Sequence, residues 1–163
     1  MSSLDKKNNL DADSNELSYE LLEVAIQESI SEKTSAVQAL HGIKFTFAFD
    51  ESSLNPVICK PNLLRRVISN LIQNAIEASS QGGVIELRTY RNSDDKVTFE
   101  IKDQGSGIDL SILEKLFQKN VTFGKASGSG LGLYFVKQNI DLWGGGISFK
   151  TSSQGISFSI VFT

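Results

Sequence analysis

Residues 61–80 read PNLLRRVISNLIQNAIEASS and carry the clearest periodic pattern in the chain. Pro61 suits the first turn of a helix, and Gly82 and Gly83 provide a stop just beyond Ser80. The apolar side chains recur every three or four positions, the spacing of one helix face, and comprise Leu63, Leu64, Val67, Ile68, Leu71, Ile72, Ala75 and Ile76. The stretch therefore predicts an amphipathic helix with a broad buried face.

Two asparagines, Asn70 and Asn74, lie four positions apart and share one side of this helix. At about 100° per residue they fall with Gln73 and Glu77 opposite the apolar face, with Arg66 beside them. Asn74 stands at the border, where an amide can be partly desolvated and still reach a ligand. Its oxygen is a neutral ligand that suits Mg²⁺ held together with phosphate oxygens. On this helix alone, a solvated polar face is the favoured interpretation, because a polar side is the default for an amphipathic helix.

Strands and helices alternate on both sides of the helix. Alternating apolar residues predict strands at 43–49, 57–60, 84–91, 96–103, 147–151 and 156–162. Helical spacing predicts helices at 19–33, 111–118 and 131–142, with Asp109 as the cap of the second. This order predicts an α/β two-layer sandwich: a mixed, mostly antiparallel sheet with about three helices on one face.

The bulk composition narrows the class of protein. The 163 residues fit one domain, expected at 19–163, after a polar segment at 1–18 that we expect to be disordered. The net charge of -3 argues against nucleic acid as a partner, and no apolar run approaches the roughly 20 residues of a membrane helix. The single cysteine, Cys59, cannot form an internal disulfide and fits a cytoplasmic setting.

An acidic residue at the end of one predicted strand has the parity of buried positions. Val97, Phe99 and Ile101 point to one side, and Asp103 shares their parity, so its carboxylate should point inward and needs a partner. The residues that follow, QGSGI at 104–108, include two glycines that let backbone approach a ligand ring. The pattern resembles a site that accepts a hydrogen bond from the amine of a base, although for this motif alone a turn is the favoured interpretation. Such a tight turn would be closed by the aspartate itself.

A glycine-rich run, GSGLGL at 128–133, opens the last predicted helix. Backbone N–H groups at a helix N-terminus bind anions, and glycines let phosphates approach closely. Lys125 lies just upstream and could reach a terminal phosphate. The spacing is neither that of a P-loop nor that of GxGxxG, and a mobile loop is the alternative.

Four blocks in this order resemble the GHKL ATPase superfamily, and within it the catalytic domain of sensor histidine kinases. NLIQNAIEAS (70–79) is similar to the N box, DQGSGI (103–108) to the G1 box, LFQKNVTFGK (116–125) to the F box and GSGLGL (128–133) to the G2 box. The similarity covers roughly residues 20–163 and implies the Bergerat fold, with ATP and Mg²⁺ as cofactors.

The resemblance also implies roles for individual residues. Catalysis is expected at Asn70, Asn74 and Lys125, with the metal on Asn74 and the adenine amine on Asp103. The nucleotide is expected to contact Asn70, Asn74, Glu77, Asp103, Gly105, Gly107, Ile108, Phe123, Lys125, Gly128, Gly130, Leu131, Gly132 and Leu133.

The type of chemistry follows from Asn70. Gyrase-like relatives carry a water-activating glutamate at this position, whereas an amide cannot act as a general base, so phosphoryl transfer is expected rather than rapid hydrolysis.

The only histidine, His41, precedes a strand and lacks a following acid, so the acceptor histidine is expected on a separate dimerisation and phosphoacceptor domain. A response regulator receiver domain is expected as an indirect partner. The isolated domain is expected to be a monomer without membrane contact. An anti-sigma-factor-type serine kinase and a regulatory nucleotide-binding domain without kinase activity are the alternatives.

Overall fold

A mixed five-stranded sheet forms one layer of the molecule. The computed structural model describes residues 17–51, 56–121 and 130–163. The sheet has the order β2-β4-β5-β7-β6 and consists of β2 (Lys44–Phe49), β4 (Val84–Arg91), β5 (Val97–Lys102), β7 (Gly155–Val161) and β6 (Gly146–Ser152). β2 and β4 are parallel, and the other three neighbouring pairs are antiparallel. The predicted mixed, mostly antiparallel sheet is confirmed.

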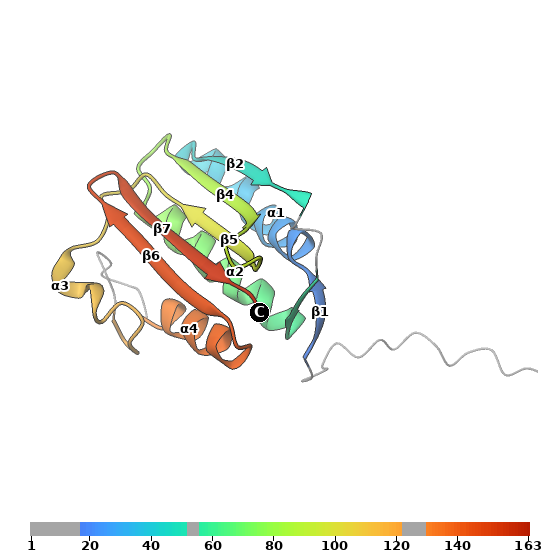
Figure 1. Ribbon diagram of the computed structural model, residues 1–163. Helices are drawn as coiled ribbons and strands as arrows, with labels where there is room; N and C mark the ends of the chain where they lie inside the picture. Colours follow the sequence, from blue (N-terminus) through green and yellow to red (C-terminus); the bar gives the residue numbers. More distant parts are fainter. Residues whose placement is uncertain (1–16, 52–55, 122–129) are drawn as a thin grey trace, which may run out of the picture.

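Three helices cover one face of this sheet (Figure 1). They are α1 (Leu22–His41), α2 (Pro61–Ala78) and α4 (Gly132–Leu142). α2 lies in the middle and contacts both α1 and α4. A fourth helix, α3 (Leu110–Leu113), is a single short turn. The two-layer arrangement with three helices on one face matches the prediction from sequence.

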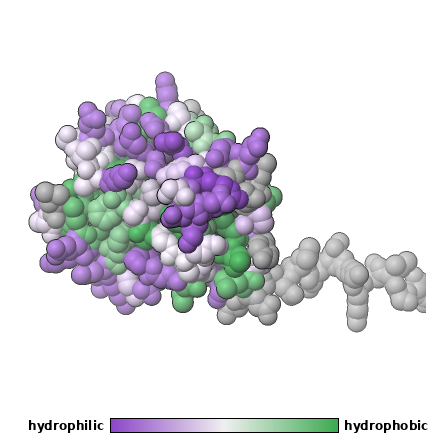
Figure 2. Space-filling view, in the orientation of Figure 1, coloured by the Kyte–Doolittle hydropathy of each residue, from purple (hydrophilic) through white to green (hydrophobic). Residues whose placement is uncertain are grey.

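The apolar face of α2 forms the centre of the core. Its buried residues are those that the periodicity predicts, apart from Leu63, which is partly buried: Leu64, Val67, Ile68, Leu71, Ile72, Ala75 and Ile76. The inward side chains of β4 and β5, such as Leu87 and Phe99, belong to the same cluster. The opposite face of the sheet is polar, and in Figure 2 hydrophilic side chains cover much of it. There Arg88 and Glu100 form an ion pair of 3.7 Å across β4 and β5.

The N-terminal part of the fold differs from the prediction. The helix predicted from residue 19 is preceded by a strand: Ser18, expected in the polar segment, and residues 19–21 form β1 (Ser18–Leu21), which pairs antiparallel with β3 (Pro56–Cys59) in a separate two-stranded sheet. The helix then begins at Leu22 and continues to His41 rather than ending at residue 33. The pairing of β1 depends on a strand almost forty residues away, which no local pattern reveals. Cys59 on β3 is buried, and desolvation raises the pKa of its thiol to about 12.

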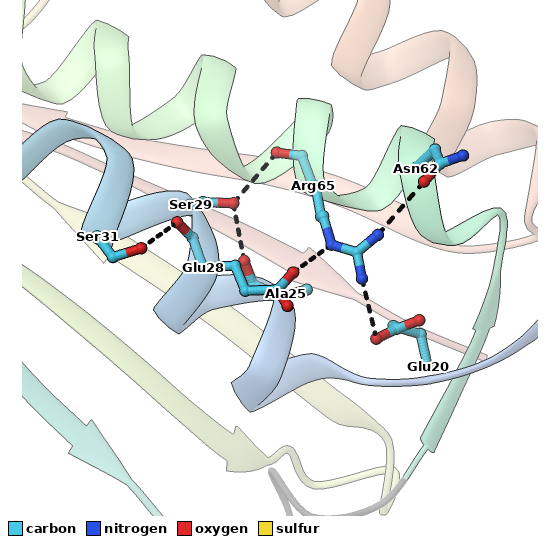
Figure 3. A network of polar contacts seen from close by, with 7 residues as sticks. All are labelled: Glu20, Ala25, Glu28, Ser29, Ser31, Asn62 and Arg65. Atoms are coloured by element: carbon cyan, nitrogen blue, oxygen red, sulfur yellow. Dashed lines mark hydrogen bonds and ion pairs between the residues drawn. The ribbon is translucent and has the colours of Figure 1, made fainter. Parts of the chain in front are cut away.

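A polar network joins β1, α1 and α2 at the outer edge of this unit (Figure 3). The Arg65 guanidinium pairs with Glu28 and, at 3.8 Å, with Glu20, while Arg65 Nη1 donates to Asn62 Oδ1 at 3.3 Å. The Ser29 hydroxyl donates to the carbonyl of Arg65 at 3.3 Å. Exposed pairs of this kind contribute about 0–1 kcal/mol each, so the network orients α1 on α2 more than it stabilises the fold. Throughout the described ranges, no helix combines the length and apolar character needed to cross a membrane.

Replacing Ile68, which is 0% exposed in the face of α2, by alanine tests the importance of this core. We expect Ile68→Ala to lower the free energy of unfolding by about 2–5 kcal/mol, because it leaves a cavity between α2 and the sheet. Urea unfolding followed by circular dichroism measures the change. The matched control is Ile58→Ala on β3, where the side chain is 40% exposed and a loss below about 1 kcal/mol is expected. Equal losses in both variants would contradict the assignment of the core.

Candidate nucleotide-binding site

The carboxylate of Asp103 lies buried immediately beyond the end of β5. Only 3% of the residue is exposed, which confirms the inward orientation predicted from strand parity. Its Oδ1 accepts hydrogen bonds from the backbone N–H groups of Gly105, at 2.9 Å, and Ile156, at 3.3 Å. The backbone N–H of Asp103 donates to the carbonyl of Ile156 at 3.0 Å. The side chain is therefore held between β5, the turn that follows it and the start of β7.

Burial determines the titration of this carboxyl. Desolvation raises the pKa of Asp103 above its ordinary value, and the two backbone donors only partly oppose that effect. Both of these bonds use Oδ1, so Oδ2 is the oxygen positioned to accept a further hydrogen bond. A buried acceptor of this kind selects a ligand that offers an N–H donor.

The turn at 105–108 packs tightly between α2 and the hairpin of β6 and β7. A Cβ atom at Gly105 would lie 2.4 Å from the carbonyl oxygen of Ala78, the last residue of α2. Gly107 has a φ of +71°, and a Cβ atom there would lie 2.1 Å from the carbonyl oxygen of Ser152. The N–H of Ile108 donates to Thr151 Oγ1 at 2.9 Å. Both positions therefore require glycine, because backbone carbonyl groups of other segments approach them closely. The turn lies against Ala78, which is one helical turn beyond Asn74 on α2.

The two asparagines of α2 are both partly buried. The side-chain nitrogen of Asn74 is buried and has no hydrogen-bond partner. The Asn70 side chain faces the first residue of α4, because a Cβ atom at Gly132 would lie 3.7 Å from Asn70 Oδ1. An unsatisfied buried amide is costly, and a bound ligand would give it a partner.

The outer side of the same helix carries Glu77. Its carboxylate accepts from Gln73 Nε2 at 2.7 Å, and Gln73 Oε1 accepts from Lys33 Nζ of α1 at 2.9 Å. Glu77 is exposed, so it lies beside the asparagines at the rim of the site. The chain of bonds connects α1 to the polar face of α2.

The start of α4 supplies uncapped backbone donors. Leu131 precedes the helix and provides no side-chain hydrogen bond to its first turn. N–H groups left free at a helix start favour a bound anion. Gly130 has a φ of +65°, Leu131 is exposed, and Leu133 packs partly buried against the core. Three other residues predicted for the site, Phe123, Lys125 and Gly128, lie outside the described residues.

Protein ligands for a metal ion are few here. In the part of the chain that the structure describes, no group of three or more His, Cys, Asp or Glu side chains could hold a metal ion. Asn74 and Asn70 offer neutral amide oxygens. This donor set fits Mg²⁺, which retains water and takes phosphate oxygens as its other ligands.

The structure brings together residues that the sequence separates, and it adds contacts that the motifs do not contain. The turn at 105–108 joins Asp103 to the end of α2, and Asn70 joins α2 to the start of α4. The Ile156 N–H that donates to the Asp103 carboxylate lies 53 residues further along the chain. No local sequence signal identifies this contact, because it is a backbone group of an ordinary strand.

Comparisons with known proteins agree with this geometry. The family described as "Histidine kinase-, DNA gyrase B-, and HSP90-like ATPase" matches residues 59–163. The chain is 35% identical over 130 residues to the signal transduction histidine-protein kinase AtoS of Escherichia coli (strain K12), covering 79% of the chain and 21% of AtoS. It is 40% identical over 97 residues to the alginate biosynthesis sensor protein KinB of Pseudomonas aeruginosa, covering 58% of the chain and 16% of KinB. The chain thus spans about a fifth or less of these relatives.

A solved structure of a histidine kinase catalytic domain has a similar fold. The catalytic domain of histidine kinase ThkA, in a nucleotide-free form, superimposes with a TM-score of 0.80 at 28% identity, covering 90% of this chain and 97% of that one. The similarity therefore extends over nearly all of both chains.

A Cβ atom at position 105 should force the turn away from α2. We expect Gly105→Ala to lower the free energy of unfolding by about 1–3 kcal/mol, because the backbone of Ala78 cannot move aside without disturbing the helix end. Thermal and urea unfolding measure the loss. Gly146→Ala is the matched control, since nothing lies within 4 Å of a Cβ atom there. A stability of Gly105→Ala equal to that of the control would contradict the described packing.

The raised pKa of Asp103 predicts a dependence of stability on pH. The folded protein binds this proton more tightly than the unfolded chain, in which the carboxyl has its ordinary pKa of 3.8. The stabilisation from this group is therefore fully present below pH 3.8 and is lost as the pH rises through the raised pKa. Asp103→Asn cannot ionise, so we expect its stability relative to wild type to increase with pH through that window.

Urea unfolding of both proteins between about pH 4 and pH 7 measures this difference. Asp109→Asn is the control: hydrogen bonds from Ser111 lower the pKa of exposed Asp109, so its contribution changes mainly below pH 3.8 and the relative stability of this variant should stay nearly constant over the measured range. A relative stability of Asp103→Asn that falls with rising pH would contradict the burial effect.

Proposed function

Because the chain belongs to the histidine kinase-, DNA gyrase B- and HSP90-like ATPase family, we propose that it binds ATP with Mg²⁺ and delivers the γ-phosphate to a histidine on a separate domain. It is a histidine-kinase-type ATP-binding domain in sequence and fold. The observation that carries the proposal is the buried Asp103 carboxylate, held by two backbone N–H groups beside the glycine turn.

Asp103 recognises the base. Its free carboxylate oxygen accepts a hydrogen bond from the exocyclic amine of adenine, and Gly105 and Gly107 let the turn lie against the ring. Guanine presents a carbonyl oxygen at the corresponding position, which a buried carboxylate would repel. The site is therefore selective for adenine nucleotides.

The polar face of α2 and the start of α4 hold the phosphates. Asn74 coordinates Mg²⁺, Asn70 lies on the phosphate side, and the first-turn N–H groups of α4 bind phosphate oxygens. When bound, Mg²⁺ neutralises charge on the phosphates. The remaining proposed contacts are Glu77, Ile108, Phe123, Lys125, Gly128, Gly130, Leu131, Gly132 and Leu133.

The reaction is transfer rather than rapid hydrolysis. The Asn70 amide cannot remove a proton from water, so this chain supplies no general base at that position. Catalysis then rests on positioning the γ-phosphate and on electrostatic stabilisation. The acceptor is the dimerisation and phosphoacceptor domain of a sensor kinase, and a response regulator receives the phosphoryl group afterwards.

Calorimetry with ATP and Mg²⁺ tests the nucleotide site. Wild type is expected to bind ATP more tightly than GTP, and Asp103→Asn to weaken ATP binding by roughly tenfold to hundredfold, because an amide nitrogen replaces an acceptor oxygen. Asp94→Asn, in the exposed turn between β4 and β5, is the control and should bind like wild type. Wild type that binds no ATP would refute the proposal.

Incubation with radiolabelled ATP and a phosphoacceptor domain supplied in trans tests the transfer. We expect acid-labile label on the acceptor and little free phosphate. Acid-stable label would indicate a serine kinase, and nucleotide binding without label would indicate a regulatory domain. Release of phosphate at gyrase-like rates would contradict the assignment of Asn70.

A further inference from the structure

One arginine of the chain lacks a carboxylate partner among the described residues. The chain has four arginines. Arg65 pairs with Glu20 and Glu28, and the other two paired arginines are Arg88, with Glu100, and Arg91, with Asp95. Arg66 follows Arg65 directly, yet no described acid forms an ion pair with it. Its charge is therefore available for a ligand.

An aromatic ring holds this free guanidinium in place. The Cζ atom of Arg66 lies 4.2 Å from the centroid of the Phe135 ring on α4. Such stacking orients the planar group and uses its face, while its N–H donors at the edge stay free for hydrogen bonds. A long, exposed side chain is thereby restricted at the seam between α2 and α4.

The position of Arg66 along α2 places it at the phosphate end of the proposed site. Asp103 and the glycine turn lie against Ala78 at the C-terminal end of the helix. Asn74, Asn70 and Arg66 follow at intervals of four residues toward its N-terminus, about 6 Å apart along the axis. A nucleotide with its base at Asp103 and its phosphates along α2 therefore reaches Arg66 last.

The contacts between α2 and α4 follow the same order. Asn70 faces Gly132, the first residue of α4, and Arg66 stacks on Phe135, one turn further along that helix. Phe135 N–H donates to the Leu131 carbonyl at 2.8 Å, so its backbone belongs to the first turn of hydrogen bonds in α4. The guanidinium thus lies against α4 one turn beyond the helix start, whose N–H groups receive no side-chain cap.

We propose that Arg66 binds the terminal phosphate of the nucleotide, with Phe135 as the positioning residue that holds its guanidinium at the seam between α2 and α4. This inference rests on the proposed function, because it requires ATP at the site. The edge of a guanidinium matches two phosphate oxygens and carries a permanent charge. A contact at the terminal phosphate distinguishes a nucleoside triphosphate from the diphosphate that remains after transfer.

The test compares the affinities for AMPPNP, a non-hydrolysable ATP analogue, and for ADP, both with Mg²⁺, by calorimetry. Arg66→Gln should weaken AMPPNP binding by roughly tenfold to hundredfold and ADP binding by less than about twofold, since only AMPPNP has the terminal phosphate. Arg66→Lys, which keeps the charge without the planar fork, should recover part of the difference. Phe135→Leu should reduce the preference for AMPPNP several-fold without removing the charge.

The matched control is Arg88→Gln on the open face of the sheet, which should leave both affinities unchanged. Thermal unfolding without nucleotide shows whether each variant is folded, and Arg66→Lys tests the same preference if Arg66→Gln is not. Equal losses for AMPPNP and ADP, or no loss for either, would overturn the role of Arg66 while leaving the proposed function intact. Failure of wild type to bind either nucleotide would overturn both.

Discussion

The buried carboxylate of Asp103 holds together the end of β5, the start of β7 and the turn at 105–108, which lies against the end of α2. Its Oδ1 accepts hydrogen bonds from the backbone N–H groups of Gly105, two residues along the chain, and of Ile156, 53 residues along the chain. Burial raises its pKa, so the ionised form is held at some expense in stability. The Gly105 bond closes the turn that follows β5, as a turn-forming aspartate does, and the same burial with Oδ2 unused by these two bonds is what recognition of a base would need.

The helix α2 serves the core and the site at once. Its apolar face packs on the sheet, and its polar side presents Asn70 and Arg66 toward α4 and also carries Asn74. Because a well-packed helix is rigid, the spacing of these polar groups is set by the helix rise and not by a flexible loop. The buried, unpaired nitrogen of Asn74 fits such a platform, since a ligand that reaches it satisfies a polar group the fold leaves open.

Elements with strong local patterns were predictable, and those defined by distant pairing were not. The face of α2, the β4–β5 hairpin and the Asp109 cap match the sequence analysis. The sequence predicts a helix from residue 19, whereas residues 19–21 belong to β1, which becomes a strand only by pairing with β3. The helix expected at 111–118 is shortened to Leu110–Leu113. Boundaries such as these depend on tertiary contacts, which override weak local propensity.

Sequence alone was sufficient for the parts of this protein that follow from periodicity and spacing. The alternation of side chains along a strand predicted that Asp103 points inward. The helical period placed Asn70 and Asn74 on one side of α2, and the order of the four motifs indicated the family. Tertiary structure was needed for the donor from Ile156, the meeting of Asn70 with Gly132 and the stacking of Arg66 on Phe135. These contacts join segments between 53 and 69 residues apart, and only the packing of helices on the sheet brings them together.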